Sequence, residues 1–558
     1  MFVRAKKSGP YQYLQVVENR REGTKVVQRV ISTLGRLDRL NAKGDIESLV
    51  RSLSRFSEQT MLVLSGKSNL LAEARKIGPA LVFERLWEEL GMGTVLKELL
   101  KDRLFGFDVE RAVFLTVLHR LMVSGSDRYC EKWRRDYVIR GTESLSLHQL
   151  YRAMAFLGEE VVDQADATPF SPRCTKDVLE EHLFHGQRHL FQGLDLVFFD
   201  TTSLYFEGEG GETLGKRGYS KDHRPDLNQM VVGAVLDHHG RPICCEIWPG
   251  NTTDVKTLIP IAQRIQKRFQ VAQFCLVADR GMISNETMKA LDDPETGLPY
   301  ILGVRMRKVK EVRDQVLADT QEFREVRPEG KSPKDPSPLQ VKEVTVNGRR
   351  YIVCLNSKEA RKDQADREAI LASLEEQLKK GATSLVGNRG FRRYLKSEKG
   401  TFAIDREKVK QDALFDGKWV LTTNTRLKAD EVALKYKELW QVEHLFRDTE
   451  SLLETRPIFH KCDETIRGHV FCSFLALVLK KELYRRLEAA GNSFEWSDIK
   501  QDLKSLQEIT LDEDGKRLAV RTQCQGTCGK VFQAVGVAVP PTIREITGWF
   551  PDEQIVDL

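Results

Sequence analysis

Residues 194–200 read LDLVFFD, and residues 274–279 read FCLVAD. Both stretches are apolar runs of strand length that end in a carboxylate, Asp200 in the first and Asp279 in the second. A short apolar run bounded by polar residues is typical of a strand buried on both faces. The two stretches therefore predict buried strands that each end in an aspartate.

The sequence between these runs predicts the rest of a sheet. Residues 228–237 (NQMVVGAVLD) and 241–250 (RPICCEIWPG) have strand composition, and DHHG between them predicts a hairpin turn. Residues 257–269 have helical periodicity, with Asp254 at or just before the N-cap, and residues 283–293 predict a second helix. Three antiparallel strands, a crossover helix and a fourth strand describe the first half of a ribonuclease H-like α/β fold.

The flanking sequence divides into segments of different character. Residues 1–60 alternate apolar and polar side chains and predict a hairpin with a Glu22-Gly23 turn, whereas residues 61–190 have helical periodicity. The expected domains are a basic strand-rich N-terminal region (1–60), a helical module (61–190), the first half of the core (191–300), an insertion with a β-rich part and a charged helix (301–417), the second half of the core (418–490), and a C-terminal region (491–558).

The charge of the chain is concentrated near its N-terminus. The net charge is only +6 over 558 residues. The basic residues between positions 1 and 43 are Arg4, Lys6, Lys7, Arg20, Arg21, Lys25, Arg29, Arg36, Arg39 and Lys43, and the acidic ones are Glu18, Glu22 and Asp38. Such an excess suits contact with a phosphate backbone. A solvated basic surface is the alternative interpretation.

Nothing in the sequence predicts a membrane or secreted protein. The start of the chain, MFVRAKKSGPYQYLQ, has no apolar core of signal-peptide length. The longest apolar run, residues 470–479, is about half of a membrane span and predicts a buried helix. The ten cysteines are scattered, which favours reduced thiols. We therefore expect a cytoplasmic protein.

A third acidic residue lies in residues 436–450, YKELWQVEHLFRDTE. On a helical period Glu443 falls among the aromatic side chains of Tyr436, Trp440 and Phe446. A carboxylate that loses its hydration among aromatic rings is costly unless something compensates its charge. A divalent metal ion shared with two aspartates would be such compensation.

The three acids suit one kind of chemistry. Mg²⁺ prefers oxygen ligands and only a few protein carboxylates, which leaves positions for water and phosphate. Two such ions, about 3.5–4 Å apart, can activate an attacking hydroxyl and stabilise a leaving oxygen at phosphorus. We therefore predict that Asp200, Asp279 and Glu443 bind Mg²⁺, with Mn²⁺ as the alternative, and catalyse phosphoryl transfer on nucleic acid.

Each acid also has a simpler interpretation. An aspartate at a strand end is commonly a turn residue, and Glu443 could form an ion pair with Arg447 four residues later. The joint pattern favours the metal site. On the same interpretation, Arg447 can pair with phosphate, and Tyr436 and Trp440 offer rings for stacking on an unpaired base.

Two other motifs have only part of the pattern of a known ligand site. Residues 210–216, GGETLGK, have the spacing of a phosphate-binding P-loop, but the next residue is arginine and no helix start follows. A basic DNA-facing loop is the better interpretation, and its members are Lys216, Arg217, Lys221 and Arg224. Cys524 and Cys528 have the spacing of half a zinc site, but no second pair follows them.

The sequence resembles the DDE transposases of bacterial insertion sequences. It is similar to the IS4-like, IS1634-type branch, which is marked by a tyrosine-arginine-glutamate-lysine signature around the last acid. The resemblance covers residues 190–485 and extends to the basic N-terminus. It rests on these segments: FFDTTSLYFEG, GYSKDHRPDLNQMVVGAVLD, GRPICCEIWPGNTTD, LVADRGMIS and YKELWQVEHLFR. One difference stands out: Tyr436 and Glu443 match the signature, whereas Leu439 and Glu450 replace its arginine and lysine.

The resemblance implies a function. Asp200, Asp279 and Glu443 would be the catalytic metal ligands, and a β-rich insertion would separate the last two. The enzyme would bind double-stranded DNA at the element ends, cleave it and join the ends to target DNA, as a homodimer on DNA. The N-terminal strand-rich region and the helical module would then contact DNA. The alternatives are a nuclease on the same fold without strand transfer, and a catalytically impaired DNA-binding derivative.

Overall fold

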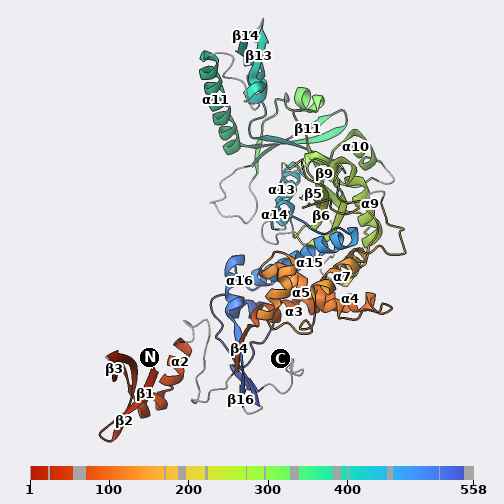
Figure 1. Ribbon diagram of the computed structural model, residues 1–558. Coiled ribbons are helices and arrows are strands. Elements are labelled where there is room, and N and C mark those ends of the chain that lie inside the picture. The colour runs from red at the N-terminus through yellow and green to blue at the C-terminus, as the bar shows by residue number, and fades with distance from the viewer. Residues whose placement is uncertain are drawn as a thin grey trace. The chain divides into compact units, whose positions relative to one another are not determined.

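The computed structural model describes most of the chain in two compact units (Figure 1). The described residues are 2–22, 25–53, 71–168, 171–186, 196–219, 224–271, 273–293, 297–326, 339–380, 391–398, 401–448, 457–513 and 516–545. The first unit comprises Met1–Lys76, Gln507–Gln523 and Pro540–Leu558, and the second comprises Ile77–Leu506 and Cys524–Val539.

The first unit contains two antiparallel sheets. The first sheet and the helices after it are β1 (Phe2–Ser8), β2 (Tyr11–Glu22), β3 (Lys25–Arg36), α1 (Leu37–Lys43) and α2 (Asp45–Leu53). Glu22 pairs with Lys25, which confirms the predicted hairpin. The second sheet has the order β18-β17-β16-β4 and comprises β4 (Leu71–Lys76), β16 (Gln507–Glu513), β17 (Lys516–Arg521) and β18 (Ile543–Glu545).

Strand β4 corrects the prediction that helical structure begins near residue 61. Leu71–Lys76 is a strand that pairs antiparallel with Gln507–Asp512 of β16. Its backbone hydrogen-bond partners lie more than 400 positions away in the sequence, so periodicity within the segment does not reveal them. The C-terminal region, for which the sequence predicted no structure, supplies these strands.

The second unit contains a helical layer. Its helices are α3 (Gly78–Glu89), α4 (Met92–Leu99), α5 (Val109–Met122), α6 (Asp127–Trp133), α7 (Leu147–Gly158), α8 (Thr175–Gly186), α15 (Asp463–Ala489), α16 (Trp496–Ser505) and α17 (Cys528–Val535). Helix α15 packs against α7, α5 and strand β7 (Pro242–Pro249), so it lies between the other helices and the sheet (Figure 1). A Cβ atom on Gly468 would lie 1.9 Å from the Met154 carbonyl oxygen, so the close contact of α15 with α7 requires glycine there.

Helix α15 contains the longest apolar run and is buried, as predicted. Among the described residues, no helix is long and apolar enough to cross a membrane. The ten cysteines are free thiols.

A nine-stranded mixed sheet forms the centre of the second unit, with the order β10-β11-β12-β15-β9-β8-β5-β6-β7. Its other strands are β5 (Leu196–Tyr205), β6 (Gln229–Asp237), β8 (Cys275–Ala278), β9 (Tyr300–Val304), β10 (Arg324–Val326), β11 (Leu339–Val346), β12 (Arg349–Asn356) and β15 (Lys418–Thr423). Strands β5, β8 and β9 are parallel, and all other neighbours are antiparallel. The chain therefore has a mixed α/β fold.

The predicted strands and helices around Asp200 and Asp279 are confirmed. Strands β6 and β7 form the hairpin expected around DHHG, and α9 (Leu258–Phe269) and α10 (Asn285–Leu291) follow β7 and β8. Asp254 is not the N-cap of α9, which is Thr257, but begins a 3₁₀ turn before it.

The segment between Asp279 and Glu443 extends the same sheet. Strands β10, β11 and β12 join it through β15, and a hairpin with Asn347-Gly348 in its turn connects β11 to β12. The charged helix is confirmed as α11 (Ser357–Lys379). This segment also contains β13 (Leu395–Glu398), β14 (Thr401–Ile404) and α12 (Arg406–Ala413).

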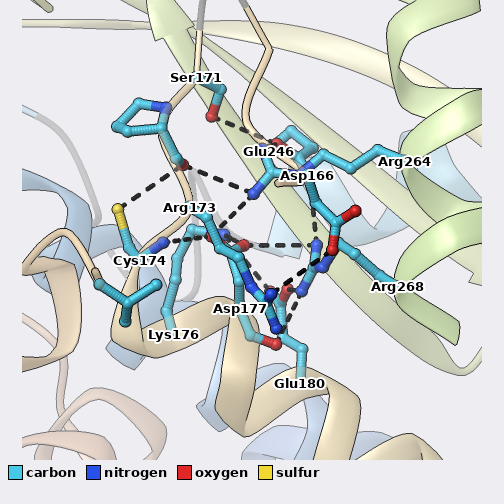
Figure 2. A network of polar contacts seen from close by, with 12 residues as sticks. Asp166, Ser171, Arg173, Cys174, Lys176, Asp177, Glu180, Glu246, Arg264 and Arg268 are labelled. Atoms are coloured by element: carbon cyan, nitrogen blue, oxygen red, sulfur yellow. Dashed lines mark hydrogen bonds and ion pairs between the residues drawn. The ribbon is translucent and has the colours of Figure 1, made fainter. Parts of the chain in front are cut away.

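A buried ion network joins α8 of the helical layer to β7 and α9 beside the sheet (Figure 2). The six charged side chains at its centre are all nearly inaccessible: Lys176, Asp177, Glu180, Glu246, Arg264 and Arg268. Arg264 contacts both Asp177 and Glu246 at 2.8 Å, and Arg268 contacts Glu180 at 2.6 Å. Three acids and three bases thus compensate one another, as burial of charge requires.

Candidate active site

Asp200 and Asp279 project from the same face of the sheet. Side chains alternate between faces along a strand. In β5, Phe198 belongs to the apolar cluster that also contains residues of α13 (Ala429–Lys437) and α14 (Trp440–Arg447), and Asp200 is the next residue on that face. In β8, Val277 belongs to the same cluster, and Asp279 follows it on that face. Both carboxylates therefore point towards the side that α13 and α14 cover.

The structure corrects the prediction that the first strand ends at Asp200. Strand β5 continues to Tyr205 because the threonines that follow Asp200 still pair with β6. What ends at this point is the pairing with β8, whose last pair is Phe199 with Ala278. Asp200 therefore lies where one side of β5 is no longer covered by a neighbouring strand, next to the end of β8 from which Asp279 emerges.

Glu443 approaches this face on a helix that is not continuous with the preceding one. Glu438 and Leu439 form a tighter turn between α13 and α14, with hydrogen bonds between residues three apart. A single unbroken helical stripe from Tyr436 to Glu443 was therefore a wrong prediction. Helix α13 packs on β8 and β9, whereas α14 packs on β5 and β6.

The environment of Glu443 also differs from the prediction. Glu443 is exposed and Trp440 is 59% exposed, so the carboxylate is not buried among aromatic rings. Phe446, by contrast, is buried in the core. Glu443 therefore keeps its hydration, contrary to the prediction.

Glu443 faces a cavity that it shares with Asp279. The cavity has a volume of about 400 Å³. Its lining residues are Asp279, Arg280, Gly303, Val304, Met306, Trp419, Val420, Tyr436, Lys437, Leu439, Trp440 and Glu443. Among the described residues, none forms an ion pair or hydrogen bond with the side chain of Glu443. Two of the three predicted acids therefore meet at one cavity with Tyr436 and Trp440, the two side chains predicted to stack on a base. Asp200 lies on the adjoining strand.

Tyr436 holds Asp279 in place. Its O–H donates to Asp279 Oδ1 over 2.9 Å. Burial and the nearby Asp279 carboxylate raise the pKa of Tyr436 above its usual value, so the phenol keeps the proton that it donates. A Cβ atom on Gly303 would lie 2.4 Å from this hydroxyl. Glycine in β9 therefore leaves the space that Tyr436 needs.

Asp254 is a fourth acid near the site, and the sequence interpretation missed its position. Its Oδ1 accepts a 2.8 Å hydrogen bond from the hydroxyl of Thr201, whose backbone N–H donates to Asp200 Oδ1 over 2.7 Å. Its Oδ2 lies 3.6 Å from where a Cβ on Gly281 would be, two residues after Asp279. Asp254 thus lies between the chain segments that carry the two aspartates. The signal was the GNTTD segment, which predicted only a helix cap.

The predicted basic residues lie outside this cavity. Lys216 and Arg217 are exposed on the loop between β5 and β6, where Lys216 bridges to Gln229. Arg224 is exposed and pairs with Asp226 at 2.9 Å. Lys221 lies outside the described residues.

The other positions that the sequence singled out in residues 436–450 differ in their exposure. Arg447 is exposed near the end of α14. Leu439, at the arginine position of the signature, is only 5% exposed and packs in the core. Glu450, at the lysine position, lies outside the described residues.

Comparison with known families decides the identity. The family model "Transposase DDE domain" matches residues 192–479, more than half of the chain. The chain belongs to the DDE transposases. The model "IS1634 family transposase, N-terminal domain" matches residues 2–67, so this is an insertion-sequence transposase of the IS1634 type, as the sequence resemblance predicted.

DDE transposases act on DNA and use divalent metal ions, so the family implies both for this transposase. No curated protein matched the transposase in a sequence search. Among solved structures, it is similar to the cryo-EM structure of a piggyBac transposase synaptic complex with hairpin DNA. The sequence identity is 10%, the TM-score is 0.34, and 76% of this chain and 79% of that chain are covered. A TM-score this low gives the similarity no weight for the fold or the partner.

Proposed function

We propose that this transposase binds the ends of its insertion sequence, cleaves them, and joins them to target DNA at Asp200, Asp279 and Glu443. The observation that carries the proposal is the arrangement of these acids. Two of them leave neighbouring parallel strands on one face, and the third faces Asp279 across a cavity on that face.

A ribonuclease H-like core is part of the proposal. Strands β7, β6 and β5 are consecutive antiparallel neighbours, and β8 and β9 continue the sheet parallel to β5. Three antiparallel strands, a crossover helix and a fourth strand are the succession that the sequence predicted for the first half of such a core. The six segments expected from the sequence, with the strand-rich N-terminal region and helical module contacting DNA, remain our proposal for the domain organisation.

The acids fit Mg²⁺ as the proposed metal, with Mn²⁺ as the alternative. All are oxygen donors on separate elements, and no ion pair with a described residue neutralises Asp279 or Glu443. The oxygens of the three acids do not all lie within 4.8 Å of one another. A pair of ions about 3.5–4 Å apart would have the two roles that phosphoryl transfer needs, activation of the attacking oxygen and stabilisation of the leaving oxygen.

The side chains around the acids would orient them and the DNA. Tyr436 holds Asp279, and Thr201 connects Asp200 to Asp254. Arg280 and Lys437 line the cavity and would contact phosphate.

Trp440 is exposed beside Glu443 and offers a ring for a displaced base. We propose Arg447 and the loop of Lys216, Arg217, Lys221 and Arg224 as further DNA contacts, and a homodimer because two DNA ends must be brought together.

Two alternatives use the same cavity. A nuclease would cleave without strand transfer, and an impaired derivative would bind DNA without cleaving it. The experiment is an assay of purified protein with Mg²⁺ on end-labelled DNA that carries the terminal repeat, together with unlabelled target plasmid. We expect cleaved ends and labelled joint products, both lost in Asp279→Asn. Cleavage without joint products would support the nuclease, and full activity of Asp279→Asn would refute the site.

A further inference from the structure

A second group of metal-ligating side chains lies outside the catalytic cavity, at Asp127, His460 and His469. Asp127 is the first residue of α6, His469 is on α15, and His460 lies in the segment that leads into α15. One potential ligand atom from each side chain lies within 4.8 Å of the other two. Within the described ranges, no other three His, Cys, Asp or Glu residues come together this closely.

The distances between the three atoms match the coordination shell of a small metal ion. His460 Nε2 is 3.3 Å from Asp127 Oδ2 and 3.1 Å from His469 Nδ1, and the last pair is 3.7 Å apart. A point equidistant from these atoms lies about 2.0 Å from each, the bond length of Zn²⁺ to imidazole nitrogen and carboxylate oxygen. Two imidazoles and a carboxylate are a ligand set of first-row transition metals.

Arg120 contacts the group from the side of the other carboxylate oxygen. Its Nη2 donates to Asp127 Oδ1 over 3.3 Å, which leaves Oδ2 to face the histidines. The same guanidinium is 3.3 Å from His469 Nε2 and 2.9 Å from Nδ1. Arg120 therefore also contacts Nδ1, the nitrogen that would bind an ion, and would have to move away from Nδ1 when an ion binds. An outer hydrogen bond that orients a ligating carboxylate is usual in metal sites.

The group is buried and connects separate parts of the unit. Asp127 is 5% exposed and His469 is 8% exposed. Ile458, two residues before His460, bridges to Phe206 directly after β5, the strand that carries Asp200. An ion bound by all three side chains would therefore connect α6 and α15 to the segment of Ile458 and His460, which bridges to the end of β5.

We propose that Asp127, His460 and His469 form a structural site for one divalent transition-metal ion, with Zn²⁺ as the best match. The ion would stabilise the packing of the helical layer against the segment that contains His460 and leads into α15. It would take no part in phosphoryl transfer. This proposal is independent of the catalytic assignment.

The test uses the full-length protein with the catalytic acids removed, as Asp200→Asn/Asp279→Asn/Glu443→Gln. After incubation with Zn²⁺ and dialysis into metal-free buffer, elemental analysis should find about one zinc per chain. The zinc should be lost when His460→Ala or His469→Ala is added. The control is His182→Ala, which changes an exposed histidine on α8 and should keep the zinc. Co²⁺ in place of Zn²⁺ should give the visible absorption of a nitrogen-ligated site, also lost with the histidines.

Thermal melting of the triple variant is a second test, which does not require the histidine variants to fold. Zn²⁺ should raise its melting temperature and a chelator should reverse the rise. Absence of retained zinc together with no shift in melting would overturn the proposal and leave the three side chains as a polar network around Arg120. Zinc retained in full by a folded His460→Ala variant would overturn it equally.

Discussion

Two acidic clusters in this transposase differ in what neutralises them. Between α8, β7 and α9, the buried acids Asp177, Glu180 and Glu246 form ion pairs inside the protein (Figure 2). Their partners are Lys176, Arg264 and Arg268. At the candidate site, Asp279 accepts a hydrogen bond from the neutral phenol of Tyr436, and Glu443 is exposed. A buried acid with internal counter-ions is costly to remove, because its partners are then left uncompensated, whereas an acid at an open cavity is available to an external cation.

The largest effect should follow from changing the cavity. Glu443→Gln removes a charge but no contact with a described residue, so its melting temperature should equal that of the wild type. Cleavage of labelled end DNA should fall by about 10³-fold or more, because several kcal/mol of metal-dependent stabilisation would be lost. Cleavage at the wild-type rate would show that Glu443 has no role in the reaction, and the contrast with the buried acids would then have no functional meaning.

The opposite result is expected for the buried cluster. Glu246→Gln removes the negative charge that forms ion pairs with Arg264 and Arg268. The change should lower the free energy of unfolding by about 3–5 kcal/mol. Cleavage per folded molecule should be unchanged. The control is Glu407→Gln, which breaks an exposed pair with Lys410 and should cost less than about 1 kcal/mol in the same denaturant titration. Equal costs would contradict the structural role of the cluster.

Acid should act on the buried cluster through Asp177. Burial by itself would raise the pKa of Asp177, but Lys176, Arg268 and Arg264 outweigh it and hold the pKa well below the usual value. The stability from this group is therefore present above about pH 4, the unfolded value, and is lost as pH falls further. Unfolding titrations from about pH 5 to about pH 3 should show a smaller loss in Asp177→Asn than in the wild type. Parallel curves would contradict this assignment.

The smallest effect should come from orientation within the cavity. Tyr436→Phe removes the hydrogen bond to Asp279 and should slow cleavage by about tenfold, the effect of one hydrogen bond to a charged group. Tyr394→Phe is the matched control, because its hydroxyl bonds Asp412 in the segment between the second and third acids. Only the first change should affect cleavage. If both slow it equally, the role of Tyr436 is not specific.

Local pattern predicted most of the elements. The hairpin at Glu22, the strands leading to Asp200 and Asp279, and the buried helix after Glu443 were all recognised, because each has its own hydrophobic period and turn residues. The pattern failed where partners are distant in sequence. Leu71–Lys76 is a strand only because β16 pairs with it.

The candidate site shows the same division. The motifs suggested three candidate acids, which remain a prediction. The helical periodicity that suggested a buried Glu443 was misleading because the helix breaks at Leu439. Asp254 was hidden because its role depends on Thr201, fifty-three positions earlier. A hydrogen bond across that separation leaves no periodic trace in the sequence.

By itself, the sequence determined the family, the succession of strands and helices, and which acids to consider, because these depend on residue types at short spacing. Only the tertiary structure decided which charges meet. The pairing of β5 with β8 brings Asp200 beside Asp279, and the packing of α14 places Glu443 at the cavity. The packing of α8 on α9 likewise gives the buried acids their counter-ions. Electrostatic interactions depend on distance in space, and the fold sets that distance.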